Sequence, residues 1–363
     1  MTGRSRGTRP DIRGVVTSAP ETAALEAFEP ALESLYRNRG EPLALIKPVI
    51  KEWPEWSLPH TFRAIVLLGF TERRFAEGAA RSLETAAGLL SDATDRERGL
   101  HAAAGHMLMG NWAEACGALE ALLIENPLDM LALHTAQNLD FFRGDPVSLR
   151  NRVIRVLPSW TPGTPGYAFV LGMHAFGLEE CNQYPEAEDA ARASLSLHPE
   201  NPWAVHALAH VLEMQGRVEE GIDHLESGAH LWALDSGFAY HNWGHLALFY
   251  LDRADDDAVL RLFDRELAEP EARFALNMID AAALLWRGLL LGIDIGTRAE
   301  PVADRWRAQI AAGAAYYAFN DFHAAVAFAL AEDMESQEAL SERLQREPAD
   351  AGLGSVNRAI GAP

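Results

Sequence analysis

The sequence has few of the features that mark secreted, membrane-spanning or nucleic-acid-binding proteins. It contains only two cysteines, Cys116 and Cys181, which argues against a disulfide framework and predicts a cytoplasmic location. No run of eighteen apolar residues occurs, so we expect no transmembrane helix. The 31 basic residues are outnumbered by 52 acidic ones, and the net charge of −21 repels phosphate backbones and anionic lipids. We therefore expect neither a nucleic-acid nor a membrane partner.

Signals for β-strands are also scarce. Runs of alternating β-branched residues and Asn-Gly hairpin turns are missing from the sequence. Segments with helical apolar periodicity follow one another instead, and Gly, Pro, Asn and Asp separate them. These patterns predict an all-α protein, and a hydrophobic content of 48% is ample for a large core.

The turn residues between these helices recur at a nearly constant interval. Successive separations are 34, 38, 34 and 38 residues for Gly110, Gly144, Asn182, Gly216 and Ala254. A period of about 34 residues is typical of the tetratricopeptide repeat, a helix–turn–helix unit. We predict a right-handed, tetratricopeptide-like α-solenoid that curls around a central cavity, with the first helix of each repeat on the concave side.

The predicted solenoid is a single body over residues 21–346. A disordered lead at residues 1–20 precedes it, and a flexible tail at residues 347–363 follows it. The expected repeats and capping helices lie at 58–91, 96–127, 129–157, 167–199, 201–233, 236–268 and 274–345.

Two pairs of histidines lie at helical spacing within residues 203–250. His206 and His210 form one pair, His241 and His245 form the other, and Glu213 shares the face of the first pair. The repeat register places these side chains on the concave face. Because adjacent helices pack about 8–10 Å apart, we expect the two rows of histidine side chains to meet across the groove.

Four imidazoles with a nearby carboxylate suit a divalent transition metal such as Fe, Mn or Zn. Ala207 stands where an HExxH metalloprotease motif would need Glu, so that class is excluded. Metal-free acid–base chemistry is an alternative, with Glu213, Asp321 or His323 moving protons. Further side chains expected to bind a substrate are His134, His174, Asn242, Trp243 and Asn320. A third interpretation is that the four histidines only hydrogen-bond to one another and join two repeats.

Three motifs together resemble the tetratricopeptide repeat protein 38 family. They are HALAHVLEM at 206–214, HNWGH at 241–245 and FNDFH at 319–323, and the resemblance covers about residues 58–331. It implies a repeat fold with polar groove residues, and it supplies no catalytic mechanism. It also implies that a large aromatic residue is usual at the position of Gly244, so that the cavity beside His241 would be roomier in this chain.

These observations lead to one functional prediction and one alternative. The prediction is an enzyme or binder of a small molecule, with a histidine-rich pocket and metal-dependent hydrolase or oxygenase activity. The alternative is a protein-interaction scaffold without catalysis, whose groove holds a peptide or partner protein. The acidic chain would then favour a basic partner. Formation of a homodimer is another possibility. A closed pocket of a few hundred Å³ would favour the first, and a long open groove the second.

Overall fold

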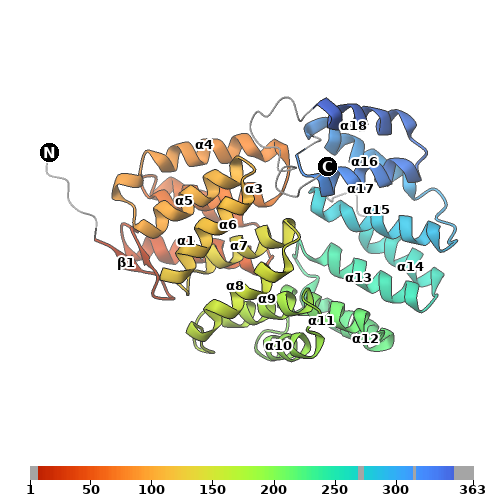
Figure 1. The fold of residues 1–363 in the computed structure, drawn as a ribbon, viewed down its shortest axis with the longest axis horizontal. Coiled ribbons are helices and arrows are strands. Elements are labelled where there is room, and N and C mark those ends of the chain that lie inside the picture. The colour runs from red at the N-terminus through yellow and green to blue at the C-terminus, as the bar shows by residue number, and fades with distance from the viewer. Residues whose placement is uncertain (1–6, 269–273, 314–315, 347–363) are drawn as a thin grey trace.

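The computed structural model describes residues 7–268, 274–313 and 316–346 (Figure 1). The tail predicted for residues 347–363 and the first six residues of the predicted lead lie outside these ranges. The chain begins with a short hairpin of strands β1 (Arg9–Pro10) and β2 (Val16–Thr17), followed by helices α1 (Thr22–Tyr36) and α2 (Pro42–Glu52).

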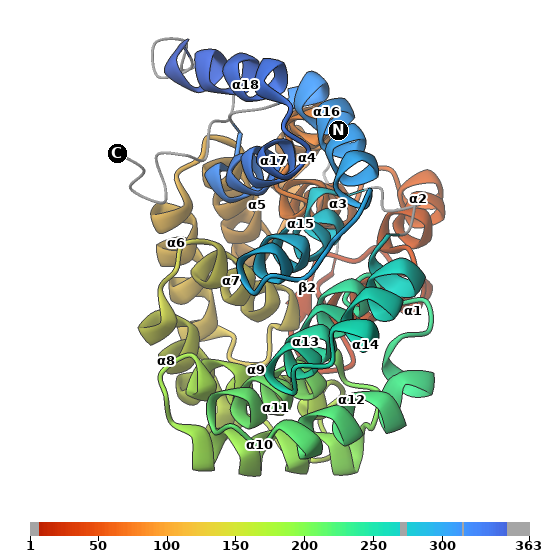
Figure 2. The ribbon, with the colours of Figure 1, turned by 90° about the vertical axis from the view of Figure 1, so that its right-hand side faces the viewer.

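The remaining helices form successive antiparallel pairs. The first helices of the pairs are α3 (Ser57–Gly69), α5 (Asp95–Leu108), α7 (Met130–Phe142), α9 (Tyr167–Glu179), α11 (Pro202–Met214), α13 (Ala239–Asp252), α15 (Ala275–Leu290) and α17 (Ala318–Leu330). The second helices are α4 (Ala76–Ala87), α6 (Trp112–Glu125), α8 (Pro146–Val156), α10 (Tyr184–Leu197), α12 (Val218–Trp232), α14 (Asp256–Leu262), α16 (Ala299–Gly313) and α18 (Met334–Arg346). Figure 2 shows the helices curling into a ring, with α7, α9, α11, α13 and α15 toward its inside. The predicted all-α solenoid is confirmed.

The turn residues that set the repeat adopt left-handed backbone conformations. All five have positive φ, from 56° at Ala254 to 72° at Gly110. At Gly216 the chain closes the end of α11 with two backbone bonds, from Gly216 N–H to Glu213 O at 2.9 Å and from Arg217 N–H to Leu212 O at 2.8 Å. This arrangement satisfies carbonyls that a helix end leaves free, and it requires a left-handed residue.

Three further residues with the same left-handed conformation do not belong to the series of turn residues that sets the repeat. Thr71, Gly292 and Glu332 have φ of 56°, 85° and 54° at the corresponding ends of α3, α15 and α17. Thr and Glu are poor markers of this conformation, because a Cβ atom makes it unfavourable.

Replacing Ala254 by glycine is expected to stabilise the protein. Relief of the left-handed alanine raises the free energy of unfolding by about 1 kcal/mol, measured from urea midpoints. The matched exchange at an equivalent turn, Gly216→Ala, is expected to lower it by a similar amount. Unchanged midpoints for both variants would contradict this account of the turns.

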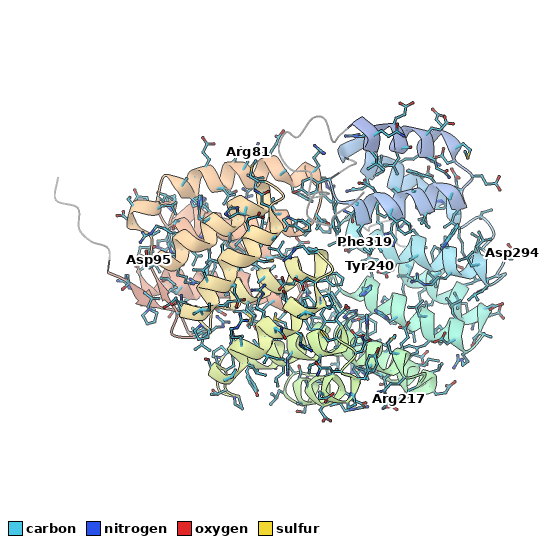
Figure 3. The ribbon with its side chains drawn as sticks, in the orientation of Figure 1. Arg81, Asp95, Arg217, Tyr240, Asp294 and Phe319 are labelled. Carbon is cyan, nitrogen blue, oxygen red and sulfur yellow. The ribbon has the colours of Figure 1, made fainter. Side chains whose placement is uncertain are left out.

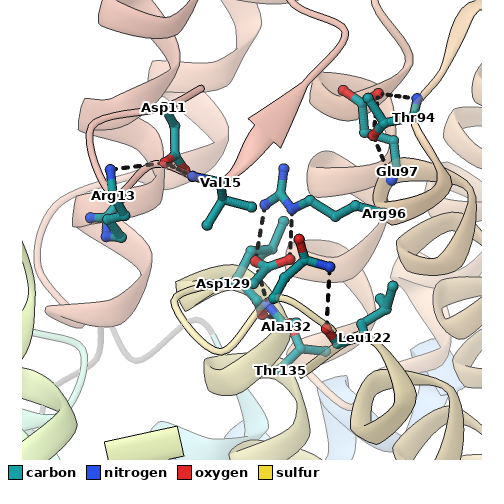
Figure 4. Close-up of polar contacts among 12 residues, drawn as sticks. Asp11, Arg13, Val15, Thr94, Arg96, Glu97, Leu122, Asp129, Ala132 and Thr135 are labelled. Carbon is teal, nitrogen blue, oxygen red and sulfur yellow. Dashed lines mark hydrogen bonds and ion pairs between the residues drawn. The ribbon is translucent and has the colours of Figure 1, made fainter. Parts of the chain in front are cut away.

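The N-terminal segment differs from the disordered lead that its composition suggests. Buried Arg13 pairs with Glu29 at 2.5 Å, and its Nε donates to the carbonyl of Pro165 at 3.0 Å. The amide of Ser18 donates to Glu97 at 3.1 Å, while Glu97 also forms a capping box with Thr94 at the start of α5 (Figure 4). These partners are distant in sequence, so local composition gives no sign of them.

The solenoid closes on itself. The ring of Phe70, at the end of α3, stacks on that of Phe274 at a centroid distance of 4.3 Å. The side-chain amide of Asn320 donates to Thr71 O at 3.0 Å, and the hydroxyl of Tyr317 donates to Phe142 O at 3.1 Å. Early and late repeats are therefore in direct contact. Within the described ranges, no helix combines the length and the apolar character needed to cross a bilayer.

Candidate functional site

The structure brings the four paired histidines together between α11 and α13. The Nε2 atoms of His206 and His241 lie 2.9 Å apart, those of His210 and His245 3.0 Å, and those of His241 and His245 3.2 Å. His206 and His245 are buried, whereas His210 and His241 are partly exposed. We call these four residues the histidine quartet. Because each helix contributes residues four apart, the two rings of each pair lie on one face and meet edge to face, with centroids 4.2 and 4.6 Å apart.

The outward nitrogens of three quartet rings face carboxylates. His210 Nδ1 lies 3.1 Å from Glu179. His241 Nδ1 lies 3.0 Å from Asp280 of α15. His245 Nδ1 lies 3.2 Å from Glu213. Because an ionised carboxylate only accepts hydrogen bonds, Nδ1 of His241 and of His245 carries the hydrogen in these contacts. In the neutral form of such a ring, Nε2 directs a lone pair inward.

Glu179 and Asp280 are site residues that sequence reasoning missed. An acidic residue on a helix is common on protein surfaces, so neither stands out without its histidine partner. One weak signal is Gly244, because a Cβ atom there would lie 2.8 Å from Asp280 Oδ1. Gly244 thus gives Asp280 room to approach His241. The roomier cavity that the family resemblance implies beside His241 is filled by this carboxylate.

Burial and mutual repulsion control the charges in the quartet. Burial lowers the pKa of His206 and His245 well below the usual value, and the neighbouring imidazoles add to the effect. Burial also acts to lower the pKa of His210, but the hydrogen bond and charge of Glu179 outweigh it and raise that pKa. Burial works to raise the pKa of Asp280, yet His241 holds it below its usual range. His206 and His245 therefore favour the neutral, electron-pair-donating form, whereas Glu179 favours the charged form of His210.

The FNDFH motif does not join the quartet as a unit. Asn320 bonds to Thr71 and so closes the solenoid. Asp321 is buried and lines a cavity of about 20 Å³ beside Thr71, room for about one water molecule. His323 is buried, and its Nδ1 donates to the carbonyl of Phe319 at 2.8 Å.

The other residues expected to bind a substrate lie mainly in the packing between helices. Trp243 packs on Trp232 with ring centroids 4.4 Å apart, and Asn242 is fully buried. His134 is buried edge-on against Trp203 at 6.0 Å. His174 is half-buried, and burial lowers its pKa.

His134 should make stability sensitive to acid. Burial lowers the pKa of His134 to about 4 from 6.5. Between pH 6.5 and 4 its imidazole therefore binds a proton in the unfolded chain but stays neutral in the folded protein. Stability is therefore lost as the pH falls through this window, by about 2 kcal/mol between pH 7 and 5. Unfolding by urea at both pH values measures the loss. Between the same two pH values, the free energy of unfolding of the variant His134→Phe should fall by about 2 kcal/mol less than that of the parent protein. Equal falls in the two proteins would contradict the assignment of this pH dependence to His134.

An aromatic surface on the inner helices was also missed. Phe141, Phe319 and Phe322 leave 42%, 44% and 63% of their surface exposed. Phe141 and Phe319 are connected through Phe142 and Tyr317, with successive ring centroids 5.7, 5.8 and 6.0 Å apart. Figure 3 labels Phe319 at the start of α17. We call the exposed residues Phe141, Phe319 and Phe322 the aromatic surface.

A buried ring, Phe176, connects the aromatic surface to the quartet. The ring of Phe176 lies 5.7 Å from Phe141 and 6.2 Å from His210. Burial raises the pKa of Glu180, and the charge of Glu179 adds to this rise. Burial likewise raises the pKa of Glu213. Both carboxylates therefore lie in surroundings that disfavour their charged form.

Comparisons with known proteins identify the fold. No family model matches the sequence. A tetratricopeptide repeat protein from Parabacteroides merdae is 12% identical over 85% of this chain and all of its own, with a TM-score of 0.43. Yeast Tom70 is 11% identical over 93% of this chain and 86% of its own, also at 0.43. A Rap protein, solved in complex with competence and sporulation factor, is 13% identical over 91% of this chain and 99% of its own, at 0.52. The fold is a tetratricopeptide-type solenoid.

These comparisons correct the functional prediction. The predicted enzyme or binder of a small molecule is wrong, because what the chain shares with these structures is a repeat fold and supplies no such activity. The geometry agrees, because three pairs of quartet Nε2 atoms lie 2.9–3.2 Å apart and leave no space between them for an organic substrate.

Proposed function

We propose that the protein is a non-catalytic interaction scaffold whose inner face binds a cationic segment of a protein partner. The motifs at 206–214, 241–245 and 319–323 further support membership of the tetratricopeptide repeat protein 38 family. The observation that carries the scaffold proposal is the aromatic surface, which exposes three phenylalanines on first helices of the solenoid.

Exposed phenylalanines on the inside of a repeat protein favour a partner. The side chain of Phe322 is 63% exposed, although burying an aromatic ring is worth about 1.5–3 kcal/mol. Contiguous apolar surface bordered by polar residues marks interaction sites. Phe319 and Phe322 belong to α17, whereas Phe141 lies in the last turn of α7, so a bound segment would bridge late and early repeats.

The charge next to this surface selects a basic segment. Glu180 and Glu213 are half-buried carboxylates with raised pKa, so a neighbouring cation would stabilise their ionised forms. Arginine and lysine also bind favourably over aromatic rings. The net charge of −21 would accelerate the approach of such a partner.

The test compares defined peptides by fluorescence anisotropy. One labelled peptide carries alternating arginine and leucine, and a second of the same length carries glutamate in place of arginine. We expect saturable binding of the arginine peptide alone, and weakening as salt is raised. Equal binding of the two peptides, or binding of neither, would overturn the proposal.

Variants locate the binding surface in the same assay. Phe322→Ser is expected to weaken binding by about tenfold or more, because exposed aromatic anchors dominate such interfaces. The control is Ile124→Ser on the outer helix α6, where the isoleucine is 62% exposed. Equal effects of the two variants would contradict the inner-face assignment.

A further inference from the structure

The histidine quartet has the donor arrangement of a metal site. Three of its rings place Nδ1 3.0–3.2 Å from Glu179, Asp280 and Glu213, and in a neutral ring with its hydrogen on Nδ1 the Nε2 lone pair faces inward. The Nε2 atoms of His210 and His245 lie 3.0 Å apart, and those of His241 and His245 lie 3.2 Å apart. Two lone pairs at that distance repel each other unless a proton or a metal cation lies between the nitrogens.

The four inner nitrogens also have the dimensions of a coordination sphere. One donor atom from each quartet residue lies within 4.8 Å of all the others. A tetrahedral zinc ion with Zn–N bonds of about 2.0–2.1 Å places its ligands about 3.3–3.4 Å from one another. Three of the six separations in the quartet, at 2.9, 3.0 and 3.2 Å, need to expand by only a few tenths of an ångström to match, and the other three lie within 4.8 Å.

We infer that the quartet binds one Zn²⁺ ion in a closed, structural site. Four imidazole ligands complete a tetrahedron and leave no open position for substrate or water, as in structural rather than catalytic zinc sites. Neutral nitrogen ligands in tetrahedral geometry suit Zn²⁺, whereas Mn²⁺ favours oxygen ligands and Cu²⁺ favours tetragonal geometry. The inference is independent of the proposed scaffold function.

The surrounding carboxylates complete the site. Histidine ligands of metals characteristically donate their other ring hydrogen to a carboxylate, which orients the ring and strengthens the ligand. Glu179, Asp280 and Glu213 occupy this position on three of the four rings. Their combined charge of −3 would offset the charge of a bound dication inside the protein.

A bound ion would connect successive repeats. The ligands belong to α11 and α13, and the supporting carboxylates belong to α9, α11 and α15. One zinc ion would therefore tie together four consecutive first helices and stiffen the curvature of the ring.

A competing set of donors shares one residue with the quartet. Glu179, Glu180 and His210 also present donor atoms within 4.8 Å of one another. In that arrangement the cation would contact His210 Nδ1 and the two carboxylates. The test must therefore distinguish the two positions.

The experiment uses full-length protein without an affinity tag, treated with chelator and titrated with Co²⁺ and then Zn²⁺. We expect one equivalent of Co²⁺ to produce the intense visible absorption of tetrahedral coordination, and one equivalent of Zn²⁺ to abolish it. Saturating Zn²⁺ should also raise the melting temperature by several degrees, because it binds only the folded state. If neither the Co²⁺ absorption nor the shift in melting temperature appears, the inference is overturned. The short Nε2–Nε2 distances would then be explained by a hydrogen shared between the rings.

Variants assign the position of the ion. His241→Gln removes a partly exposed ligand and should abolish the tetrahedral spectrum, while Asp280→Asn should weaken binding by about 10–100-fold. His230→Gln on α12 is the matched control and should bind as the parent does. Circular dichroism confirms that each variant is folded. Loss of binding in Glu180→Gln, with binding retained in His241→Gln, would place the ion at the competing site and contradict the inference.

Discussion

Replacing Asp129 by alanine is expected to lower the free energy of unfolding by about 3–5 kcal/mol, because it leaves a buried charge without its partner. Asp129 Oδ2 accepts from Arg96 Nε at 2.6 Å, and Oδ1 accepts from Arg96 Nη2 at 2.9 Å (Figure 4). Both side chains are buried. Asp129 also caps α7 by accepting from the amide of Ala132 at 3.1 Å. The loss of stability therefore has two causes: the guanidinium of Arg96 stays buried without a counter-charge, and α7 loses its N-terminal cap.

Denaturation with urea measures this effect, and two further variants assign it. Arg96→Met combined with Asp129→Ala should recover most of the loss, because no buried charge then remains. Glu77→Ala breaks the exposed pair of Glu77 with Arg81 and should change stability by less than about 0.5 kcal/mol. Equal losses in Asp129→Ala and Glu77→Ala would show that burial does not govern these pairs.

Replacing Gly177 by alanine is expected to destabilise the protein by about 2–3 kcal/mol through overpacking. A Cβ atom at Gly177 of α9 would lie 2.6 Å from the Cα atom of Arg150 and 2.9 Å from its backbone nitrogen. Rotation of a side chain cannot relieve a contact with backbone, so α8 and α9 would have to separate.

Glycine elsewhere in a first helix provides the control for Gly177→Ala. At Gly105 of α5 an added Cβ atom meets nothing within 4 Å. Because alanine favours helix formation, Gly105→Ala should be neutral or stabilising by up to about 1 kcal/mol. Melting curves of the two variants should therefore move in different directions, and a loss of equal size in both would refute the close-packing argument.

The fold could be predicted from sequence because its main determinants are local. Each turn needs a left-handed residue, and Gly110, Gly144 and Gly216 mark that need directly. Thr71 and Glu332 meet the same need with unfavourable residues, so the sequence does not mark them as left-handed positions. The ordered N-terminal hairpin was missed for another reason, because it depends on distant partners.

The site was only partly predictable. Helical spacing and repeat register anticipate that His206 and His210 face His241 and His245. They do not determine whether the rings enclose a pocket or contact one another, and that difference made the small-molecule prediction wrong. Asn320 illustrates the same limit, since its bond to Thr71 spans 249 residues.

The most direct test of the scaffold account is photo-crosslinking of the labelled arginine–leucine peptide. A photoreactive phenylalanine analogue is placed at position 322 on α17 or at position 124 on the outer helix α6. Inner-face binding predicts a strong crosslink from position 322 and a negligible one from position 124, with unlabelled peptide competing for the first. A peptide that crosslinks equally from both positions, or from position 124 alone, would contradict the proposal that the inner face holds the partner.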